Sequence, residues 1–490
     1  AESNEDTGAD AAVEDADALN SAEDAHLALT ALTKASVVQQ SADGGVTMLH
    51  RLQGQVLREN WNQGEWAGAF DAAADILDRV NVRSLPREDA EGRRRQTRDL
   101  IEQLRAIAAQ DYSHPLFERI QVRARLHHAF IQSNDLNLPS EALTLQGAVD
   151  VVEDVLGPEH TDTLTFRGGL ADAYYSSGHL DKAIALHREV LAQQYQVLGE
   201  GKIHTLTSQS NLALAYVVAG RLREAIPLHE EILANKVRVL GPRHPSTLES
   251  QNNLAYAYQV AGRLRAAITL HEDTLTKRRK ILGPTHPSTL ESQNNLAGAY
   301  QAAGRLSAAI TLYEKALADR VRVLGDDHPH TLISRSGLAG AYESAGRLSE
   351  AIPLYERVLA DRVRVLGDDH PDTLTSRSGL AGAYQAAGRL GEAITLYEKT
   401  LADRVRVLGD DHPDTLASRD GLARAYESAG RLSEAIALFE EVLADRVRVL
   451  GADHPHTLTS RSGLAGAYQA AGRLGEAITL YEKTLADRVR

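Results

Sequence analysis

The sequence predicts an all-α solenoid made of antiparallel helix pairs, and three observations carry this prediction. Glycines recur every 42 residues, at Gly178, Gly220, Gly262, Gly304, Gly346, Gly388, Gly430 and Gly472. Apolar residues lie at helical spacing on both sides of each glycine. The repeats are also rich in Ala, Leu, Glu and Arg, which favour helices. A regular period of this length is typical of solenoids, in which each unit buries its apolar face only against its neighbours.

The N-terminal residues 1–20 are predicted to form an acidic, flexible tail. Residues 1–24 contain nine Asp or Glu and no Lys or Arg, so most of the net charge of −14 lies there. With few large apolar side chains, this segment cannot bury enough surface to offset the entropy cost of ordering.

Residues 21–60 are predicted to form a helix, a hairpin and a second helix, as in half of a winged helix. The hairpin strands are expected at 36–40 and 46–49, on either side of the turn Asp43-Gly44-Gly45. The stretch His50–Arg58 resembles the winged-helix subdomain of STAND NTPases, the class that contains NB-ARC proteins. That resemblance implies that His50 senses a nucleotide phosphate, although Arg51 replaces the Asp that often follows. The alternative is that His50 caps a helix.

No phosphate-binding loop is found in the 490 residues. The nearest candidate, Gly199-Glu200-Gly201-Lys202, has Gln196 where a glycine is needed and Ile203 where Ser or Thr is needed. We therefore expect no cofactor in this chain, and we expect it to be part of a longer protein that binds ATP or ADP. Residues 61–150 have amphipathic helical patterns without the repeat landmarks and are predicted to be a helical adaptor that caps the array.

Residues 151–490 are predicted to be eight repeats, of which 371–412 is representative. Pro371 suits the first position of a helix, and Asp372 places negative charge at the positive end of the helix dipole. Gly388 is expected to end the first helix and Gly409 the second, because both positions favour a left-handed backbone. Each repeat should therefore hold two helices of about 16 to 18 residues.

The repeat resembles the tetratricopeptide repeat at its small and large core positions, which here are Leu380, Ala381, Tyr384, Gly388, Ala393 and Tyr397. The 42-residue length and the LG-x-x-HP sequence between units resemble the array of kinesin light chain and of a set of bacterial sensor proteins. The resemblance covers residues 150–490. It implies a right-handed superhelix whose first helices line a concave groove that binds peptides or protein segments.

By the same resemblance, three positions of each first helix face the groove. The predicted ligand-binding residues are Ser210, Asn252, Asn294, Ser336, Ser378 and Asp420 at the first position, Leu214, Tyr256 and Arg424 at the second, and Gln259, Gln301, Glu343, Gln385, Glu427 and Gln469 at the third. The second position is Gly298, Gly340, Gly382 or Gly466 in the other later repeats. Asn252 and Asn294 are suited to hold a peptide backbone through amide bonds, and Tyr256 offers an aromatic surface. Close helix packing explains the glycines equally well.

Catalytic and metal sites are not expected. Asp-Asp-His recurs at 326–328, 368–370 and 410–412, but three consecutive residues on a turn do not converge on one ion. The recurrence fits a helix start better. His187, His229 and His271 stand where Tyr or Phe stands in later repeats, which indicates packing. The absence of Cys excludes disulfides and Cys-ligated zinc.

Charge and hydropathy disfavour two classes of partner. The repeats are nearly neutral and lack a basic stripe, which disfavours nucleic acid. No run of 18 apolar residues exists, which disfavours a membrane span. We expect a cytoplasmic protein.

Residues 371–406 and 455–490 are identical except for Asp372 and His456, so the array has been copied in blocks of two repeats. The last unit has no polar cap, and its apolar face is expected to attract a second copy or another part of the protein. The function predicted from the sequence is that of a sensor arm of a bacterial STAND signalling NTPase, which binds a protein or peptide and relieves autoinhibition. The alternative is a free-standing peptide-binding adaptor similar to kinesin light chain.

Overall fold

The structure is a computed structural model, and it describes residues 38–40, 46–48, 149–150, 153, 157–199 and 202–489. In the N-terminal part, β1 (Val38–Gln40) pairs antiparallel with β2 (Val46–Met48), and Gln39 lies opposite Thr47. The hairpin predicted from the sequence is therefore confirmed. The acidic tail, His50, both helices of the expected winged helix and almost all of the adaptor at 61–150 lie outside the described residues.

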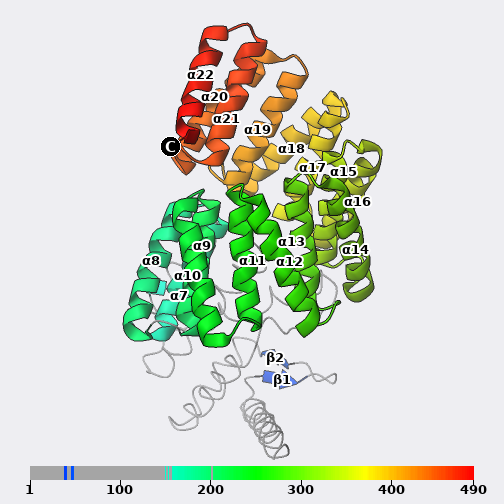
Figure 1. The fold of residues 1–490 in the computed structure, drawn as a ribbon. Helices are drawn as coiled ribbons and strands as arrows, with labels where there is room; N and C mark the ends of the chain where they lie inside the picture. Colours follow the sequence, from blue (N-terminus) through cyan, green and yellow to red (C-terminus); the bar gives the residue numbers. More distant parts are fainter. Residues whose placement is uncertain are drawn as a thin grey trace, which may run out of the picture. The chain divides into compact units, whose positions relative to one another are not determined.

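The array, from Leu164 onward, belongs to one compact unit and is described by itself. Its helices are α7 (Thr161–Ser176), α8 (Leu180–Val197), α9 (Ile203–Val218), α10 (Leu222–Leu240), α11 (Pro245–Val260), α12 (Leu264–Ile281), α13 (Pro287–Ala302), α14 (Leu306–Leu324), α15 (Pro329–Ser344), α16 (Leu348–Leu366), α17 (Pro371–Ala386), α18 (Leu390–Leu408), α19 (Pro413–Ser428), α20 (Leu432–Leu450), α21 (Pro455–Ala470) and α22 (Leu474–Val489). Consecutive pairs form repeats 1 to 8, which confirms the all-helical solenoid (Figure 1).

Each helix ends where the repeat pattern predicts. Gly388 has φ 74° and Gly409 has φ 89°, so both adopt the left-handed backbone that favours glycine. The N–H of Arg389 donates to the carbonyl of Tyr384 at 2.9 Å, and that of Gly388 donates to Gln385 at 3.0 Å. These two bonds satisfy carbonyls that the helix end would leave without partners.

The helix start contains a cap that the sequence reasoning missed. His370 precedes Pro371, and its Nδ1 accepts the backbone N–H of Asp372 at 3.1 Å. The same bond forms at the start of every first helix from α11 to α21. The imidazole is thus the N-cap side chain, a role that Ser, Thr, Asn or Asp usually has. The structural explanation of the Asp-Asp-His-Pro sequence is correct, and the histidine is its central residue.

The first helices lie on the inside of the curved array. Consecutive first helices contact one another: α11 contacts α13, and α15 contacts α17. Consecutive second helices make no comparable contact in the described repeats. Elements that approach closely lie on the inner side of a bend. The first helices therefore line the concave face, as the resemblance implied, while the handedness of the superhelix stays a prediction.

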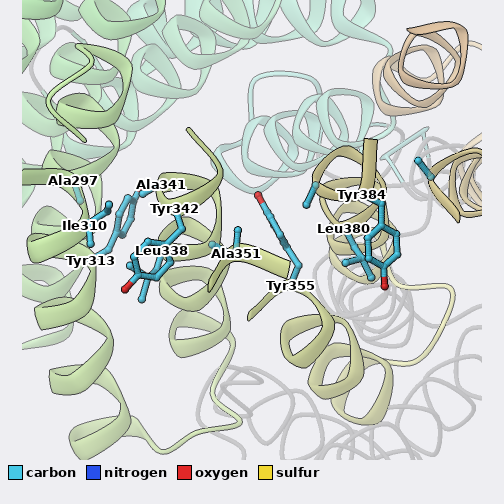
Figure 2. Packing of buried hydrophobic residues seen from close by; sticks show 13 residues of the cluster. Ala297, Ile310, Tyr313, Leu338, Ala341, Tyr342, Ala351, Tyr355, Leu380 and Tyr384 are labelled. Carbon is cyan, nitrogen blue, oxygen red and sulfur yellow. The ribbon is translucent and has the colours of Figure 1, made fainter. Parts of the chain in front are cut away.

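The interfaces that follow repeats 4 to 7 are each built around a tyrosine or phenylalanine ring. In the cluster of Figure 2, Tyr313 and Ile310 of α14 pack with Leu338 of α15, and Tyr355 and Leu380 repeat this arrangement one unit later. The rings fit because the facing residue is glycine. A Cβ added at Gly337 would lie 2.5 Å from Cε1 of Tyr313, closer than such atoms approach in proteins.

Buried arginines also join consecutive helices. Arg362 of α16 is 4% exposed and donates to the carbonyl of Asp372 at 2.8 Å and to Oγ of Ser376 at 2.7 Å. Burial lowers the pKa of this guanidinium, because desolvation penalises the charged form. Arg320, Arg404 and Arg446 make the same pair of bonds in their repeats. In the described part of the chain, no helix is long and apolar enough to cross a membrane.

Candidate protein-binding groove

The first of the three predicted groove positions is largely occupied by contacts within the array. Asn252 is buried, and its Oδ1 lies 3.1 Å from Nδ1 of His271. Oδ1 of Asn294 accepts a hydrogen bond from Ser334 of the next repeat at 3.0 Å. Both amides therefore orient neighbouring side chains, which leaves them less free to hold a peptide backbone than the sequence suggested.

The other residues at this position are serines and one aspartate. Ser210 donates to the carbonyl of Leu206 within its own helix. Ser336 and Ser378 are half-buried, and Oγ of Ser378 has no hydrogen-bond partner. Asp420 is buried between two guanidiniums, 2.9 Å from Nε of Arg424 and 3.2 Å from Nη1 of Arg446. Asp420 therefore forms ion pairs within the array, with Arg424 and Arg446.

The second position separates the array into two types of surface. In repeats 2 and 3 it carries Leu214, which is half-buried, and Tyr256, which is 44% exposed. In later repeats the glycine leaves room for a tyrosine of the second helix. A Cβ at Gly340 would lie 3.3 Å from the hydroxyl of Tyr355, so this hydroxyl lies directly behind the helix that lines the groove. Arg424 replaces this glycine in repeat 7, where the facing ring is Phe439, which has no hydroxyl.

The third position alternates between Gln and Glu in the later repeats. Gln301 and Gln385 each donate to a serine one repeat later, Ser344 and Ser428, at 2.9 and 3.0 Å. Glu343 accepts a hydrogen bond from Tyr355 at 2.8 Å. Burial raises the pKa of Glu343, and the same cause raises the pKa of Glu427. Gln259 is half-buried, and Gln469 is exposed.

An exposed apolar patch lies on α9 and α11, and the sequence reasoning found only part of it. We call Val218, Tyr256 and Val260 the apolar patch; they are 36%, 44% and 40% exposed. Val218 and Val260 stand where the other repeats have Ala or Ser, which is the signal that was overlooked. In repeat 1, burial raises the pKa of Tyr175, and the nearby Tyr256 and Asp172 raise it further.

The carboxylates of the Asp-Asp-His sequences bind arginine. Asp326 lies 2.6 Å from Nη2 of Arg335, and Asp327 lies 2.5 Å from Nη2 of Arg364 one repeat later. With the imidazole used as a helix cap, none of the three groups is directed at a common point. Across the described residues, no group of three His, Cys, Asp or Glu side chains is arranged to hold a metal ion.

A second exposed apolar surface lies on the last helix. Leu474, Ile478, Tyr481 and Leu485 of α22 are 42 to 65% exposed. Two of their equivalents in repeat 6, Ile394 and Tyr397, are buried because the next repeat covers them.

The chain is similar to several solved arrays. It is 41% identical to a protein of Podosopora anserina assigned as a kinesin light chain with nearly identical TPR-like repeats, over 41% of this chain and 96% of that one, with a TM-score of 0.36. It is 21% identical to BtubC (BKLC) of P. vanneervenii, over 46% of this chain and 91% of that one, with a TM-score of 0.39. It is 15% identical to the quorum sensor NprR of B. thuringiensis, over 73% of this chain and 99% of that one, with a TM-score of 0.47. No curated protein sequence matches the chain.

The model of the tetratricopeptide repeat family matches the chain in overlapping segments at 204–280, 250–320, 288–362, 350–404, 372–446 and 434–488. These segments cover more than half of the 490 residues. They coincide with repeats 2 to 8, whose helix pairs, glycine turns and inward-facing first helices are described above. The chain therefore belongs to the tetratricopeptide repeat family.

Proposed function

We propose that the array is a sensor arm that binds a protein or peptide on its concave face, as part of a STAND-type bacterial signalling NTPase. Ligand binding would relieve autoinhibition by favouring an open arrangement, and it can do so only through a difference in affinity between the two arrangements. The proposal places the protein in the cytoplasm. It assigns catalysis to a nucleotide-binding part of a longer protein and none to this chain.

The apolar patch is the observation that supports this proposal best. Exposed Val218, Tyr256 and Val260 are unusual on a face that is otherwise polar and lined by small residues, and exposed apolar clusters commonly mark binding sites. An aromatic ring flanked by aliphatic side chains suits an apolar anchor residue of a peptide. Glu343 and Glu427, farther along the same face, favour a ligand that also carries basic residues.

The test uses a random twelve-residue peptide library displayed on phage and panned against the full chain. We expect the selected peptides to combine an apolar residue with Lys or Arg. In fluorescence anisotropy, Tyr256→Ala with Val260→Ala should weaken their binding by about tenfold or more, as for a truncated anchor pocket. The matched control is Val239→Ala with Val447→Ala, two exposed residues of second helices, which should bind unchanged. Equal binding by the two double variants would refute the groove assignment.

The second candidate function is a free-standing adaptor similar to kinesin light chain, favoured by the repeat length and the LG-x-x-HP sequence. Both functions use the same groove, so peptide binding does not separate them. The coding sequence upstream of Ala1 does. A phosphate-binding loop there supports the sensor arm, whereas a start codon directly before Ala1 supports the adaptor.

We also propose that the exposed face of α22 binds a second copy of the chain. Two of its four large apolar side chains, Ile478 and Tyr481, stand at positions that repeat 6 buries against the next repeat, as Ile394 and Tyr397. Light scattering at rising protein concentration should show dimers or larger species, and Leu485→Glu with Ile478→Glu should shift the protein to monomers. A wild-type chain that stays monomeric at high concentration would show that this face has no such role.

A further inference from the structure

A space over Gly382, on the concave face of repeat 6, is bordered by two oxygen atoms and is otherwise open. Gly382 is the second of the three groove positions of α17 and is half-buried. A Cβ built on it would lie 3.4 Å from the hydroxyl of Tyr397 and 3.6 Å from Oε1 of Glu343. Beyond its own helix, no other atom of the described residues comes within 4 Å of that Cβ. Tyr397 belongs to α18 and Glu343 to α15, so three helices border the space.

The half-buried carboxylate of Glu343 has no basic partner among the described residues. Its Oε2 accepts a hydrogen bond from Tyr355 at 2.8 Å, and Oε1 is the atom that borders Gly382. Burial raises the pKa of Glu343, and only the hydrogen bond from Tyr355 opposes this shift. By contrast, Asp361 of α16 is bound by Arg335 at 2.7 Å. A partly desolvated carboxylate without a cation is unfavourable, so this site is suited to receive one.

The hydroxyl of Tyr397 is a second polar group without a partner. The residue is only 8% exposed, yet its hydroxyl forms no hydrogen bond within the described part of the chain. Burial, the largest of several causes, raises the pKa of Tyr397 to about 12. Tyr355, the equivalent residue one repeat earlier, does have a partner, because it donates to Glu343 (Figure 2). Buried hydroxyls are usually hydrogen-bonded, so the position of this one beside an open space indicates a partner from outside the array.

The equivalent spaces in repeats 4 and 5 have a different chemistry. A Cβ built on Gly298 would approach the hydroxyl of Tyr313 alone, at 3.3 Å. One built on Gly340 would lie 3.3 Å from the hydroxyl of Tyr355 and 3.6 Å from Nε2 of Gln301. That hydroxyl already donates to a glutamate and that amide to a serine. An amide nitrogen donates and does not accept, so neither space offers a negative charge to a cation.

The equivalent space in repeat 8 is a weaker version of the one over Gly382. A Cβ built on Gly466 would lie 3.5 Å from Oε1 of Glu427 and 3.8 Å from the hydroxyl of Tyr481. Here the charge of Arg424 opposes the raised pKa of Glu427, although this arginine is itself bound to an aspartate of its helix. Tyr481 is also 42% exposed. Among the described repeats, only the space over Gly382 combines a carboxylate without a cation and a buried hydroxyl without a partner.

The two oxygens favour an ammonium group over a guanidinium group. An ammonium group donates three hydrogen bonds from a single atom, which suits two acceptors on either side of a small space. A guanidinium group binds a carboxylate best through both carboxylate oxygens, and Oε2 of Glu343 is already occupied by Tyr355. Lysine also carries its charge as a compact group at the end of a narrow, flexible chain, which suits entry between helices.

We propose that the space over Gly382 binds the ammonium group of a lysine side chain of the peptide ligand, with Glu343 supplying the negative charge and Tyr397 a second acceptor. The inference rests on the proposed function, because it assigns one residue of the ligand that the concave face binds. The site is separate from the apolar patch, which lies on repeats 2 and 3.

Filling the space tests the proposal without removing a charged group. In Gly382→Ala the new methyl group would make ordinary van der Waals contacts with both oxygens, so the helix accommodates it. The peptide selection described above is repeated on this variant and on Gly391→Ala, the matched control, where no atom lies within 4 Å of a Cβ. We expect Lys to be enriched about threefold or more over the library by the wild type and the control, and not by Gly382→Ala.

The selection separates failure of this site from failure of the proposed function. Selected peptides in which Lys is equally enriched by Gly382→Ala, or is not enriched by the wild type, would overturn the lysine site and leave the groove assignment standing. A wild-type chain that selects no peptide would refute the groove assignment and the lysine site together.

Fluorescence anisotropy with a selected peptide then identifies the carboxylate. Exchanging its Lys for norleucine, which keeps the chain without the ammonium group, should weaken binding to the wild type by about tenfold and to Glu343→Gln by much less. Glu356→Gln is the matched control, because Glu356 also accepts a tyrosine hydroxyl at 2.8 Å but lies on the second helix α16. It should respond to the exchange as the wild type does. An equal loss with the wild type and Glu343→Gln would overturn the proposal.

Discussion

Ring size and the residue that faces the ring are matched along the array. In repeats 4 to 7 the ring of the second helix faces a glycine of the next repeat, in the pairs Tyr313–Gly337, Tyr355–Gly379, Tyr397–Gly421 and Phe439–Gly463. In repeats 1 to 3 the ring is an imidazole and the residue at the position of that glycine is asparagine, in the pairs His187–Asn211, His229–Asn253 and His271–Asn295. A six-membered ring needs the space that a missing Cβ provides, while the smaller imidazole leaves room for a side chain. The exchange of His for Tyr is therefore a packing feature, as the sequence indicated, and its partner lies in the next repeat.

Replacing Gly337 with Ala should lower the free energy of unfolding by about 1 to 3 kcal/mol, because the new methyl group overlaps the Tyr313 ring in a packed interface. Urea denaturation followed by circular dichroism measures the change. Gly391→Ala is the control, since no atom lies within 4 Å of a Cβ there, and it should stabilise the helix by about 0.5 to 1 kcal/mol.

The smaller ring should rescue the substitution. Combined with Tyr313→His, Gly337→Ala should cost less than the two separate changes together, because the imidazole vacates the space that the methyl group needs. Additive losses in this double-mutant cycle would show that ring and glycine are not coupled.

At the scale of the helix, the first turn depends on a histidine whose neutral form accepts a backbone hydrogen bond. His286 is exposed and caps α13 by accepting the N–H of Ser288 at 3.2 Å. The adjoining Pro287 fixes the backbone for the helix start but supplies no acceptor. Sequence alone predicted the position of the helix start correctly, since proline and glycine restrict the backbone locally, but it did not identify the side chain that caps it.

Removing the cap should loosen the first turn of the helix. We expect His286→Ala to cost about 0.5 to 2 kcal/mol of local stability, and His286→Asn to recover most of it, because Asn also accepts the N2 N–H. Hydrogen exchange of the Ser288 amide measures the change site by site. Equal protection in the wild type and His286→Ala would contradict the assignment of the cap.

At the scale of the whole molecule, buried neutral histidines make the stability of the array depend on pH. Burial lowers the pKa of His229, His271 and His454 to about 4, from an ordinary value of 6.5. Burial also lowers the pKa of His412, whose Nε2 lies 3.4 Å from the carbonyl of Ser176 in repeat 1. Between these values the unfolded chain binds more protons than the folded chain, so protons favour unfolding.

The free energy of unfolding should therefore be fully retained above about pH 6.5 and fall as the pH is lowered towards 4. Thermal melts at half-unit steps of pH measure this dependence. His229→Gln together with His271→Gln should flatten the slope in this window, because two of the titrating groups are removed. A slope unchanged by the double variant would show that these histidines titrate normally in the folded protein.

The sequence by itself determined the period, the helix ends, the repeated apolar positions and the family, because each depends on local backbone preference or on a pattern that recurs every 42 residues. Only the tertiary structure decided which side chains of the concave face remain available to bind a ligand. Asn252 and Asp420 are polar and occupy groove positions in the repeat, yet His271 and Arg446 of neighbouring helices already bind them. The contact of His412 with Ser176 joins residues 236 positions apart, and it depends on the accumulated curvature of the repeats between them, a quantity that no single repeat encodes.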